Sequence, residues 1–282
     1  MEKAKRMKSI LIIGGSGFIG QALYKELNRF YSTSCTYYSK TSFSTNQKFH
    51  FWDVEQTAQL PELLNRVQPK LIICALKGPF DALIQMNREL CNYVDTNDCR
   101  LMCLSTVHVF DTFRHFPSYE YDKTLSESLY GRYQIKIENQ TLQLPTAKRV
   151  IARIPMTFGQ SSPRIQKLDR KMQTKDYIEV FPNTVLNANS ISYLRRQIHY
   201  LINQQCSGIF HLGSPQLVTH QELIEKILKR RHIQSPRIKQ VFSSNALRYL
   251  AVLPKKNKLP DHLYPHIDDI LDEIDLLRRN IV

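Results

Sequence analysis

The sequence predicts an α/β protein with a doubly wound parallel β-sheet, because short apolar runs alternate with helical patterns along most of its length. With 282 residues and 42% hydrophobic content, the chain can bury the core of a globular protein. No apolar run is long enough to span a bilayer, and residues 1–6 lack the apolar core of a signal peptide. We therefore expect a cytoplasmic protein without a membrane partner.

The first predicted strand, at residues 10–13, leads into the run Gly14-x-x-Gly17-x-x-Gly20 and then directly into a helical pattern. Glycines in such a turn let the backbone approach a pyrophosphate closely, and the helix N-terminus offers free N–H groups to the anion. This order predicts a dinucleotide site. The alternative is an ordinary corner between a strand and a helix, for which one glycine would suffice.

The second predicted strand, at residues 34–38, ends in Ser39 and Lys40. In the NAD-binding form of this arrangement, a carboxylate near the end of this strand holds the ribose hydroxyls. No Asp or Glu lies between Glu26 and Asp53, whereas Ser39 and Lys40 offer a hydroxyl and a cation to a 2′-phosphate. We therefore predict NADP as the cofactor, with NAD as the alternative; a lysine that points into solvent would favour neither.

The remaining elements continue the alternation of strands and helices. Strands are predicted at 49–54, 69–75, 100–106, 150–155 and 208–213, and helices at 60–67, 82–94, 192–202, 221–230 and 268–279. Ligands of such sheets bind at the carboxyl ends of the strands. Five residues are expected at these ends: Gly14, Lys40, Asp53, Ala75 and Thr106. The periodicity weakens from 160 to about 187, where no element is predicted.

The formal net charge is +14, with cations concentrated at 226–239 and 255–258. No helix-turn-helix, zinc or aromatic-platform pattern accompanies them, so solvated basic faces are favoured over a nucleic-acid-binding role, which stays an alternative. The six cysteines form no CxxC pair and are expected to be reduced thiols. No group of His, Cys and carboxylates has metal-ligand spacing, so no metal is predicted.

Several further motifs follow the opening glycines. They are LSTVHVFD at 104–111, PSYEYD at 117–122, YG at 130–131, RIPMTFG at 153–159 and GIFHL at 208–212. Together they resemble the extended short-chain dehydrogenase/reductase family, and within it the dTDP-4-dehydrorhamnose reductases, to about residue 225. The resemblance implies a Rossmann-type doubly wound sheet with a smaller C-terminal α/β substrate-binding cap. It places the dinucleotide-binding domain at 1–160, with 186–212 returning to it, and the cap at 161–185 and 213–282.

The same resemblance implies NAD(P)H-dependent reduction of a 4-keto sugar nucleotide or a similar carbonyl compound, and it leaves a homodimer open. Tyr130 would donate the proton, and Thr106 would polarise the carbonyl oxygen. The matching cofactor positions are Gly14, Ser16, Gly17, Phe18, Ile19 and Gly20 at the pyrophosphate, Asp53 and Val54 at the adenine, and Ala75, Leu76 and Lys77 beside the nicotinamide ribose, while Asn87 matches an asparagine of the fourth helix.

One departure bears on catalysis. The family carries a lysine four residues after the tyrosine, one helical turn on, where its charge lowers the pKa of the tyrosine and its amine hydrogen-bonds the nicotinamide ribose. Gln134 occupies that position and can keep the hydrogen bond but supplies no charge. Tyr130, Thr106 and Gln134 are therefore the predicted catalytic residues of an enzyme that is attenuated. The alternative is a catalytically weak NADP-binding sensor or regulatory subunit.

Other candidates for the missing lysine or for a ligand are set aside. Lys136 lies about 120° around the helix from Tyr130 and is predicted to face elsewhere. Tyr119 and Lys123 have the lysine spacing but fall in a predicted loop. His108 and His211 lie in or directly after strands and are predicted core or near-core residues. The C-terminal R-P-x-N-x-x-L signature of the family survives only as KKNKL at 255–259.

Overall fold

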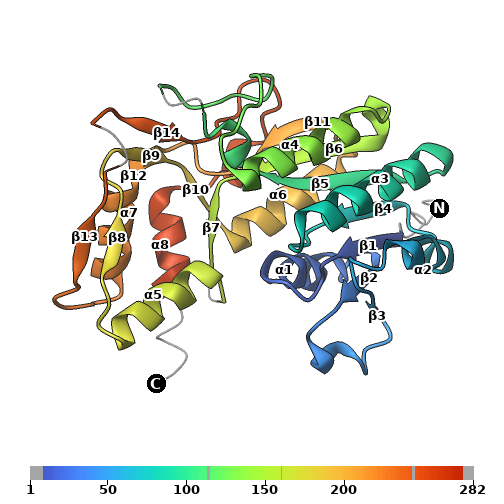
Figure 1. Ribbon diagram of the computed structural model, residues 1–282, viewed down its shortest axis with the longest axis horizontal. Coiled ribbons are helices and arrows are strands. Elements are labelled where there is room, and N and C mark those ends of the chain that lie inside the picture. The colour runs from blue at the N-terminus through green and yellow to red at the C-terminus, as the bar shows by residue number, and fades with distance from the viewer. Residues whose placement is uncertain (1–8, 113–114, 160, 243–244, 276–282) are drawn as a thin grey trace. The chain divides into compact units, whose positions relative to one another are not determined.

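A computed structural model describes residues 9–112, 115–159, 161–242 and 245–275 (Figure 1). The chain divides into two compact units. Unit 1 comprises residues 1–105, 132–152 and 198–209, and unit 2 comprises residues 106–131, 153–197 and 210–282. The predictions made for residues 1–6 and 276–279 lie outside the described residues. The predicted domain boundaries, which follow the family's topology, stay a prediction.

A seven-stranded sheet forms the centre of unit 1, in the order β11-β6-β5-β4-β1-β2-β3. The strands are β1 (Ser9–Ile13), β2 (Ser32–Tyr37), β3 (Phe49–Phe51), β4 (Leu71–Cys74), β5 (Arg100–Thr106), β6 (Arg149–Ile154) and β11 (Gly208–His211). β1 pairs in parallel with both β2 and β4, and the pairs β2–β3 and β4–β5 are also parallel. The α/β class and the Rossmann-type parallel sheet are confirmed, and every predicted strand coincides with an observed one.

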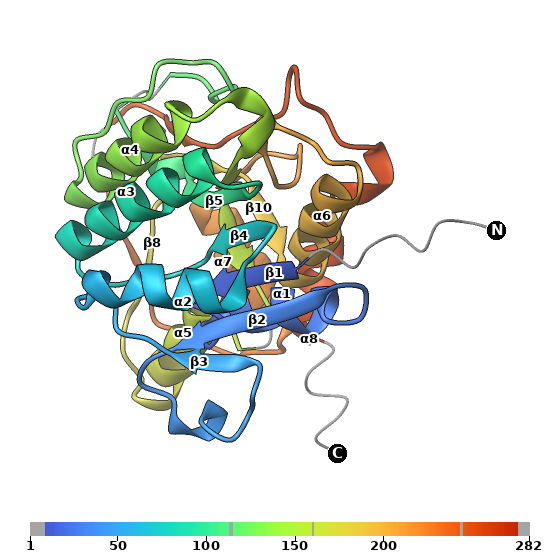
Figure 2. The ribbon, with the colours of Figure 1, turned by 90° about the vertical axis from the view of Figure 1, so that its right-hand side faces the viewer.

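Helices cover both faces of this sheet, so the central strands β1 and β4 are apolar without alternation; Ile10 to Ile13 of β1, for example, are fully buried. The helices are α1 (Phe18–Leu27), α2 (Leu60–Val67), α3 (Phe80–Thr96), α4 (Leu129–Leu142) and α6 (Ile191–Asn203). α2, α3 and α4 lie on one face (Figure 2), where Asn87 Nδ2 of α3 donates to Ile137 O of α4 at 3.2 Å. On the other face, His199 Nδ1 of α6 lies 3.0 Å from Glu26 Oε1 of α1.

Unit 2, as far as the structure describes it, contains short strands and helices of its own. Its strands are β7 (Met156–Phe158), β8 (Ile178–Val180), β9 (Thr184–Leu186), β10 (Ala188–Ser190), β12 (Val218–Thr219), β13 (Ile238–Gln240) and β14 (Arg248–Leu250). They form the small sheets β10-β7, β12-β9-β14 and β13-β8. Its helices are α5 (Pro163–Gln173), α7 (His220–Arg230) and α8 (Ile267–Asp275). Single 3-10 turns complete the chain: η1 (Thr41–Phe43), η2 (Thr57–Gln59), η3 (Val107–Phe110), η4 (Thr146–Lys148) and η5 (Asp261–Leu263).

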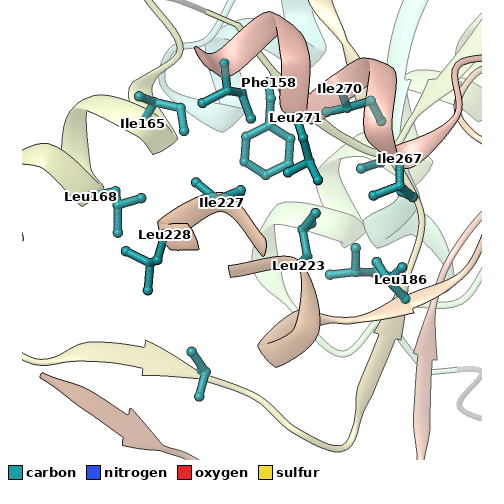
Figure 3. Packing of buried hydrophobic residues seen from close by; sticks show 14 of the residues in the cluster. Phe158, Ile165, Leu168, Leu186, Leu223, Ile227, Leu228, Ile267, Ile270 and Leu271 are labelled. Atoms are coloured by element: carbon teal, nitrogen blue, oxygen red, sulfur yellow. The ribbon is translucent and has the colours of Figure 1, made fainter. Parts of the chain in front are cut away.

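The core of unit 2 is a cluster of aliphatic side chains around Phe158 (Figure 3). Ile165 and Leu168 of α5 pack into this cluster together with side chains of α7 and α8. No element was predicted at 160–187, so α5, β8 and β9 correct the sequence analysis. The strands were missed because three residues are too few to establish a period. The start of α5 did have a signal, a serine followed by proline, which is typical of an N-cap and the first helical position.

No helix among the described residues has both the length and the apolar character that crossing a membrane requires.

Candidate active site

The glycine run forms a turn between β1 and α1 in which side chains would not fit. Gly14 has a φ of +86°, and a Cβ atom there would lie 2.8 Å from Leu76 Cα. A Cβ atom on Gly20 would lie 2.1 Å from Gly14 O. Gly17 is the N-cap of α1 and provides no side-chain acceptor for the first N–H groups of the helix. The loop therefore has the close backbone approach and the free N–H donors that suit a pyrophosphate.

The ends of the neighbouring strands meet this loop inside unit 1. Ala75 N, directly after β4, donates to Ile13 O at 2.9 Å, and Leu76 borders Gly14. Val54, after β3, is buried, and a Cβ atom on Gly78 would lie 3.2 Å from its Cγ1. The ends of β1, β3 and β4, which the sequence analysis expected at one edge, are thus gathered there by packing.

The polar side chains predicted at this edge differ in how they are held. Asp53 Oδ1 accepts the N–H of Glu55 at 3.0 Å, so its carboxylate is fixed at the end of β3. Ser39, Lys40 and Lys77 are exposed. They are free to reach a ligand, and among the described residues no hydrogen bond or ion pair fixes their side chains.

Gln134 is buried in α4, and its amide is only half satisfied. Its Nε2 donates to the hydroxyl of Tyr133 at 2.7 Å, while its Oε1 has no hydrogen-bond partner among the described residues. The ring of Tyr133 stacks on Phe80, with centroids 4.2 Å apart. A buried carbonyl oxygen without a donor costs free energy unless a ligand supplies one. A ribose hydroxyl is such a donor, so this position fits a dinucleotide. Lys136, which was predicted to face away from Tyr130, is exposed.

The two hydroxyls predicted to act on the carbonyl are brought together in unit 2. Thr106 ends β5, and its Oγ1 accepts the N–H of His108 at 3.3 Å. The Tyr130 hydroxyl is hydrogen-bonded to the Thr106 side chain. The His108 ring meets the Tyr130 ring edge to face, with centroids 5.4 Å apart. His108 is half-buried beside this pair, which agrees with its prediction as a near-core residue.

Burial raises the pKa of the Tyr130 phenol above its usual range, although the hydrogen bond with Thr106 and the charge of Arg164 both lower it. Burial also lowers the pKa of His108; Asp111 raises it, and Arg164 and Arg248 lower it further. At neutral pH the phenol is therefore protonated and the imidazole is neutral. Tyr130 is in the protonation state that a proton donor needs.

A carboxylate holds the segment that leads into Tyr130. Asp111 Oδ2 accepts from Ser126 Oγ at 2.8 Å and from Ser128 Oγ at 2.6 Å, and Asp111 Oδ1 accepts the N–H of Glu127 at 2.8 Å. Ser128 Oγ in turn accepts the N–H of Gly131 in the first turn of α4, at 3.0 Å. Burial opposes ionisation, but these bonds outweigh it and hold the pKa of Asp111 below its usual range. The start of α4, and with it Tyr130, is thereby positioned.

The acidic motif at 117–122 does not position Tyr130 but binds the backbone of the segment at 255–257. The Glu120 carboxylate accepts the backbone N–H groups of Lys255, Lys256 and Asn257 at 2.9 to 3.3 Å. Arg153 Nη1 donates to Glu120 O at 2.8 Å. This motif anchors the segment that carries the remnant of the C-terminal signature, a role that the sequence analysis missed.

Tyr119 and Lys123 lie outside any helix, so they do not share a helical face, as predicted. Instead Lys255 Nζ lies 5.1 Å from the centroid of the Tyr119 ring. His211 is a core residue, as predicted, with Nδ1 3.0 Å from Leu253 O. Its burial and the nearby Arg153 lower its pKa to about 3.

The six cysteines are free thiols. Within the described ranges, no three or more His, Cys, Asp or Glu side chains form a group that could hold a metal ion.

The family model described as the RmlD substrate binding domain matches residues 7–260. The chain belongs to this family. The RmlD match extends over both units and confirms the family expected from the motifs. Among curated proteins, none matches the chain.

Solved structures share the fold of this RmlD family member at low sequence identity. The NADP complex of dTDP-4-dehydrorhamnose reductase from Bacillus anthracis has 16% identity and a TM-score of 0.77, over 96% of this chain and 99% of that one. A hypothetical dTDP-4-dehydrorhamnose reductase from Sulfolobus tokodaii has 19% identity and a TM-score of 0.74, over 92% and 98%. The NAD complex of the Bordetella bronchiseptica enzyme WbmG has 14% identity and a TM-score of 0.77, over 99% and 96%.

Proposed function

We propose that this protein is an NADP-dependent reductase of a 4-keto sugar nucleotide or a similar carbonyl compound, with NAD as the alternative cofactor. The observation that carries the proposal is the hydrogen-bonded pair of Thr106 and Tyr130 hydroxyls at the end of β5 and the start of α4, in a chain of the RmlD family. The solved reductase with NADP and WbmG with NAD support the choice of cofactor class.

In this proposal unit 1 binds the dinucleotide. The pyrophosphate lies on Gly14, Ser16, Gly17, Phe18, Ile19 and Gly20, with Asp53 and Val54 at the adenine and Ala75, Leu76 and Lys77 at the nicotinamide ribose. Lys40 and Ser39 attract a 2′-phosphate, since both are exposed and no carboxylate lies between Glu26 and Asp53. The unpaired Oε1 of Gln134 accepts a ribose hydroxyl.

The hydroxyl pair of unit 2 acts on the substrate. The bound nicotinamide supplies the hydride for the carbonyl carbon. Tyr130 gives its phenolic proton to the carbonyl oxygen, and Thr106 polarises that oxygen as a neutral hydrogen-bond donor. The raised pKa of Tyr130 keeps the proton on the phenol until the substrate oxygen becomes basic enough to take it.

Gln134 limits the rate in this proposal. The uncharged side chain leaves the Tyr130 phenolate, which forms as the proton departs, without the cation that the family carries one turn further along the helix. Each pKa unit of lost phenolate stabilisation corresponds to about 1.4 kcal/mol, which is roughly a tenfold change in the ionised fraction of Tyr130. We expect slow turnover with ordinary cofactor affinity.

The test follows NADPH oxidation with dTDP-4-keto-6-deoxy sugars for the wild type and for the Gln134→Lys and Tyr130→Phe variants. We expect slow turnover by the wild type, a gain of about tenfold or more in Gln134→Lys, and loss of activity in Tyr130→Phe. Lys136→Gln, which changes an exposed residue on the same helix, is the control and should match the wild type.

The same experiment tests the sensor alternative, which rests on the uncharged Gln134. If NADPH binds tightly but neither the wild type nor Gln134→Lys turns over any sugar nucleotide, the reductase proposal fails. A dinucleotide sensor or regulatory subunit would then account for the site. If NADPH and NADH both fail to bind, the dinucleotide site itself is refuted.

A further inference from the structure

Resting on the proposed function, we propose that Tyr133 is a positioning residue for the cofactor: its phenol oxygen orients the amide of Gln134 so that Oε1 faces the nicotinamide ribose. The side chains that carry this inference, Phe80, Tyr133 and Gln134, all belong to unit 1, as does the proposed dinucleotide site. In this role Tyr133 acts on the cofactor only through its neighbour in α4, so it is not a catalytic residue.

The orientation of the side chain matters at position 134 because an amide has two different sides. A lysine ammonium, which the family carries there, presents three equivalent donors, so rotating it changes nothing for a ribose hydroxyl. Gln134 presents a donor group on one side and an acceptor on the other. Which of the two meets the ribose therefore depends on a group that fixes the amide.

The hydroxyl of Tyr133 is such a group. It accepts a hydrogen bond from Gln134 Nε2 at 2.7 Å, and both side chains are buried, with Tyr133 5% and Gln134 8% exposed. An amide turned the other way would withdraw the buried Nε2 from this acceptor, which costs free energy. Gln134 Oε1 is thus held on the opposite side of the amide, where it has no hydrogen-bond partner among the described residues. The bond to Tyr133 presents an acceptor that a ribose hydroxyl can satisfy.

The ring of Tyr133 is itself held in place. It stacks on Phe80, with centroids 4.2 Å apart and an interplanar angle of 20°. Phe80 is the first residue of α3, and Pro79 is the N-cap of that helix. Residues 75–77, which the proposed function assigns to the nicotinamide ribose, end three residues before Phe80. The stack therefore connects the segment beside the ribose to the helix that carries Gln134.

The substitution Tyr133→Phe removes the acceptor and keeps the stacked ring. Gln134 Nε2 is then buried without this partner, so the amide turns to pair elsewhere and must turn back when the dinucleotide binds. We expect NADPH to bind about three- to tenfold more weakly, the factor that corresponds to one hydrogen bond. Tyr93→Phe is the matched control, because it removes a phenol hydroxyl from a half-buried ring in the last turn of α3, and it should bind NADPH as the wild type does.

A shorter probe separates positioning from a general effect on the fold. 2′-Phosphoadenosine 5′-diphosphate carries the adenine, the 2′-phosphate and the diphosphate of NADPH but lacks the nicotinamide ribose. Calorimetry should give this probe the same affinity for Tyr133→Phe and the wild type, whereas fluorescence titration shows the loss for NADPH. ADP and NADH form the corresponding pair for the alternative cofactor. A distorted unit 1 would weaken the short and the complete ligand alike, and that result would overturn the proposal.

A double-mutant cycle tests whether Tyr133 acts through the amide. Gln134→Met keeps the length of the side chain and removes its amide, so it should weaken NADPH binding by itself. Adding Tyr133→Phe to Gln134→Met should cause little further loss, because the group that Tyr133 orients is gone. Losses that simply add in the double variant would contradict this route of action.

The outcomes distinguish this inference from the proposed function. If the wild type binds neither NADPH nor NADH, the dinucleotide site is refuted and the role of Tyr133 falls with it. If the wild type binds NADPH and Tyr133→Phe binds it as tightly, only the role of Tyr133 is refuted. If the expected pattern of affinities occurs in a protein without reductase activity, positioning by Tyr133 holds and the reductase proposal fails.

Discussion

The hydrogen bonds of Asp111 yield a prediction whose size follows from the structure. In Asp111→Asn, an amide replaces a carboxylate that accepts two serine hydroxyls at Oδ2 and one backbone N–H at Oδ1. The NH₂ group must face either the two serines or the N–H of Glu127, so at least one charge-assisted bond is lost. Such bonds are each worth about 1.5–3 kcal/mol, and we expect Asp111→Asn to lose about 2–4 kcal/mol of unfolding free energy. Asp122→Asn is the control, since Asp122 is exposed and accepts one backbone N–H, and it should lose about 1 kcal/mol or less.

The assay is urea unfolding at several pH values. The pKa of folded Asp111 lies below its usual range, so its stabilisation is present above the unfolded value of about 3.9 and is lost as the pH falls through the folded value. The deficit of Asp111→Asn should therefore shrink below about pH 4. Ser128→Ala should cost less in the Asn background than in the wild type, because the two residues share a bond. Equal stability of Asp111→Asn and wild type at pH 7, or additive effects with Ser128→Ala, would refute this account of how α4 is positioned.

Two further predictions concern the glycine loop and the buried histidine. Gly20→Ala should lose about 1–3 kcal/mol of unfolding free energy and most of its NADPH affinity, because the new Cβ atom lies 2.1 Å from Gly14 O. In Gly17→Ala the new Cβ atom lies 3.3 Å from the same oxygen, so both losses should be smaller. Urea unfolding and fluorescence titration with NADPH compare the two variants, and equal losses would contradict the predicted clash. His211 has a folded pKa of about 3 against about 6.5 when unfolded, so the unfolded state takes up the proton first as the pH falls. Between pH 6.5 and 4 this should remove up to about 1.4 kcal/mol per pH unit, and His211→Gln should have a shallower slope, which unfolding at pH 7, 5.5 and 4.5 measures.

The sheet of unit 1 could be predicted because its central strands are short apolar runs with sharp boundaries. Ile10 to Ile13 end at a glycine, and the run of β4 begins soon after Pro69. A parallel sheet covered on both faces demands such continuous runs, so composition alone marks them. Unit 2 offered no such signal, since most of its strands span three residues and pair with distant partners.

The candidate site was predictable where its residues lie close together in sequence. Thr106 and Tyr130 follow from motifs, and the serine three residues before Gly131 is a typical helix start that the analysis did not use. Glu120 could not be found in this way, because its partners are backbone N–H groups, which have no sequence signature.

Glu120 holds the segment at 255–257 through main-chain donors, so any residue other than proline satisfies the anchor. The anchor itself therefore places no requirement on the side chains of this segment, which can differ while its attachment persists. This arrangement permits the departure of KKNKL from the usual C-terminal signature, because the segment stays attached to Glu120 when its side chains differ.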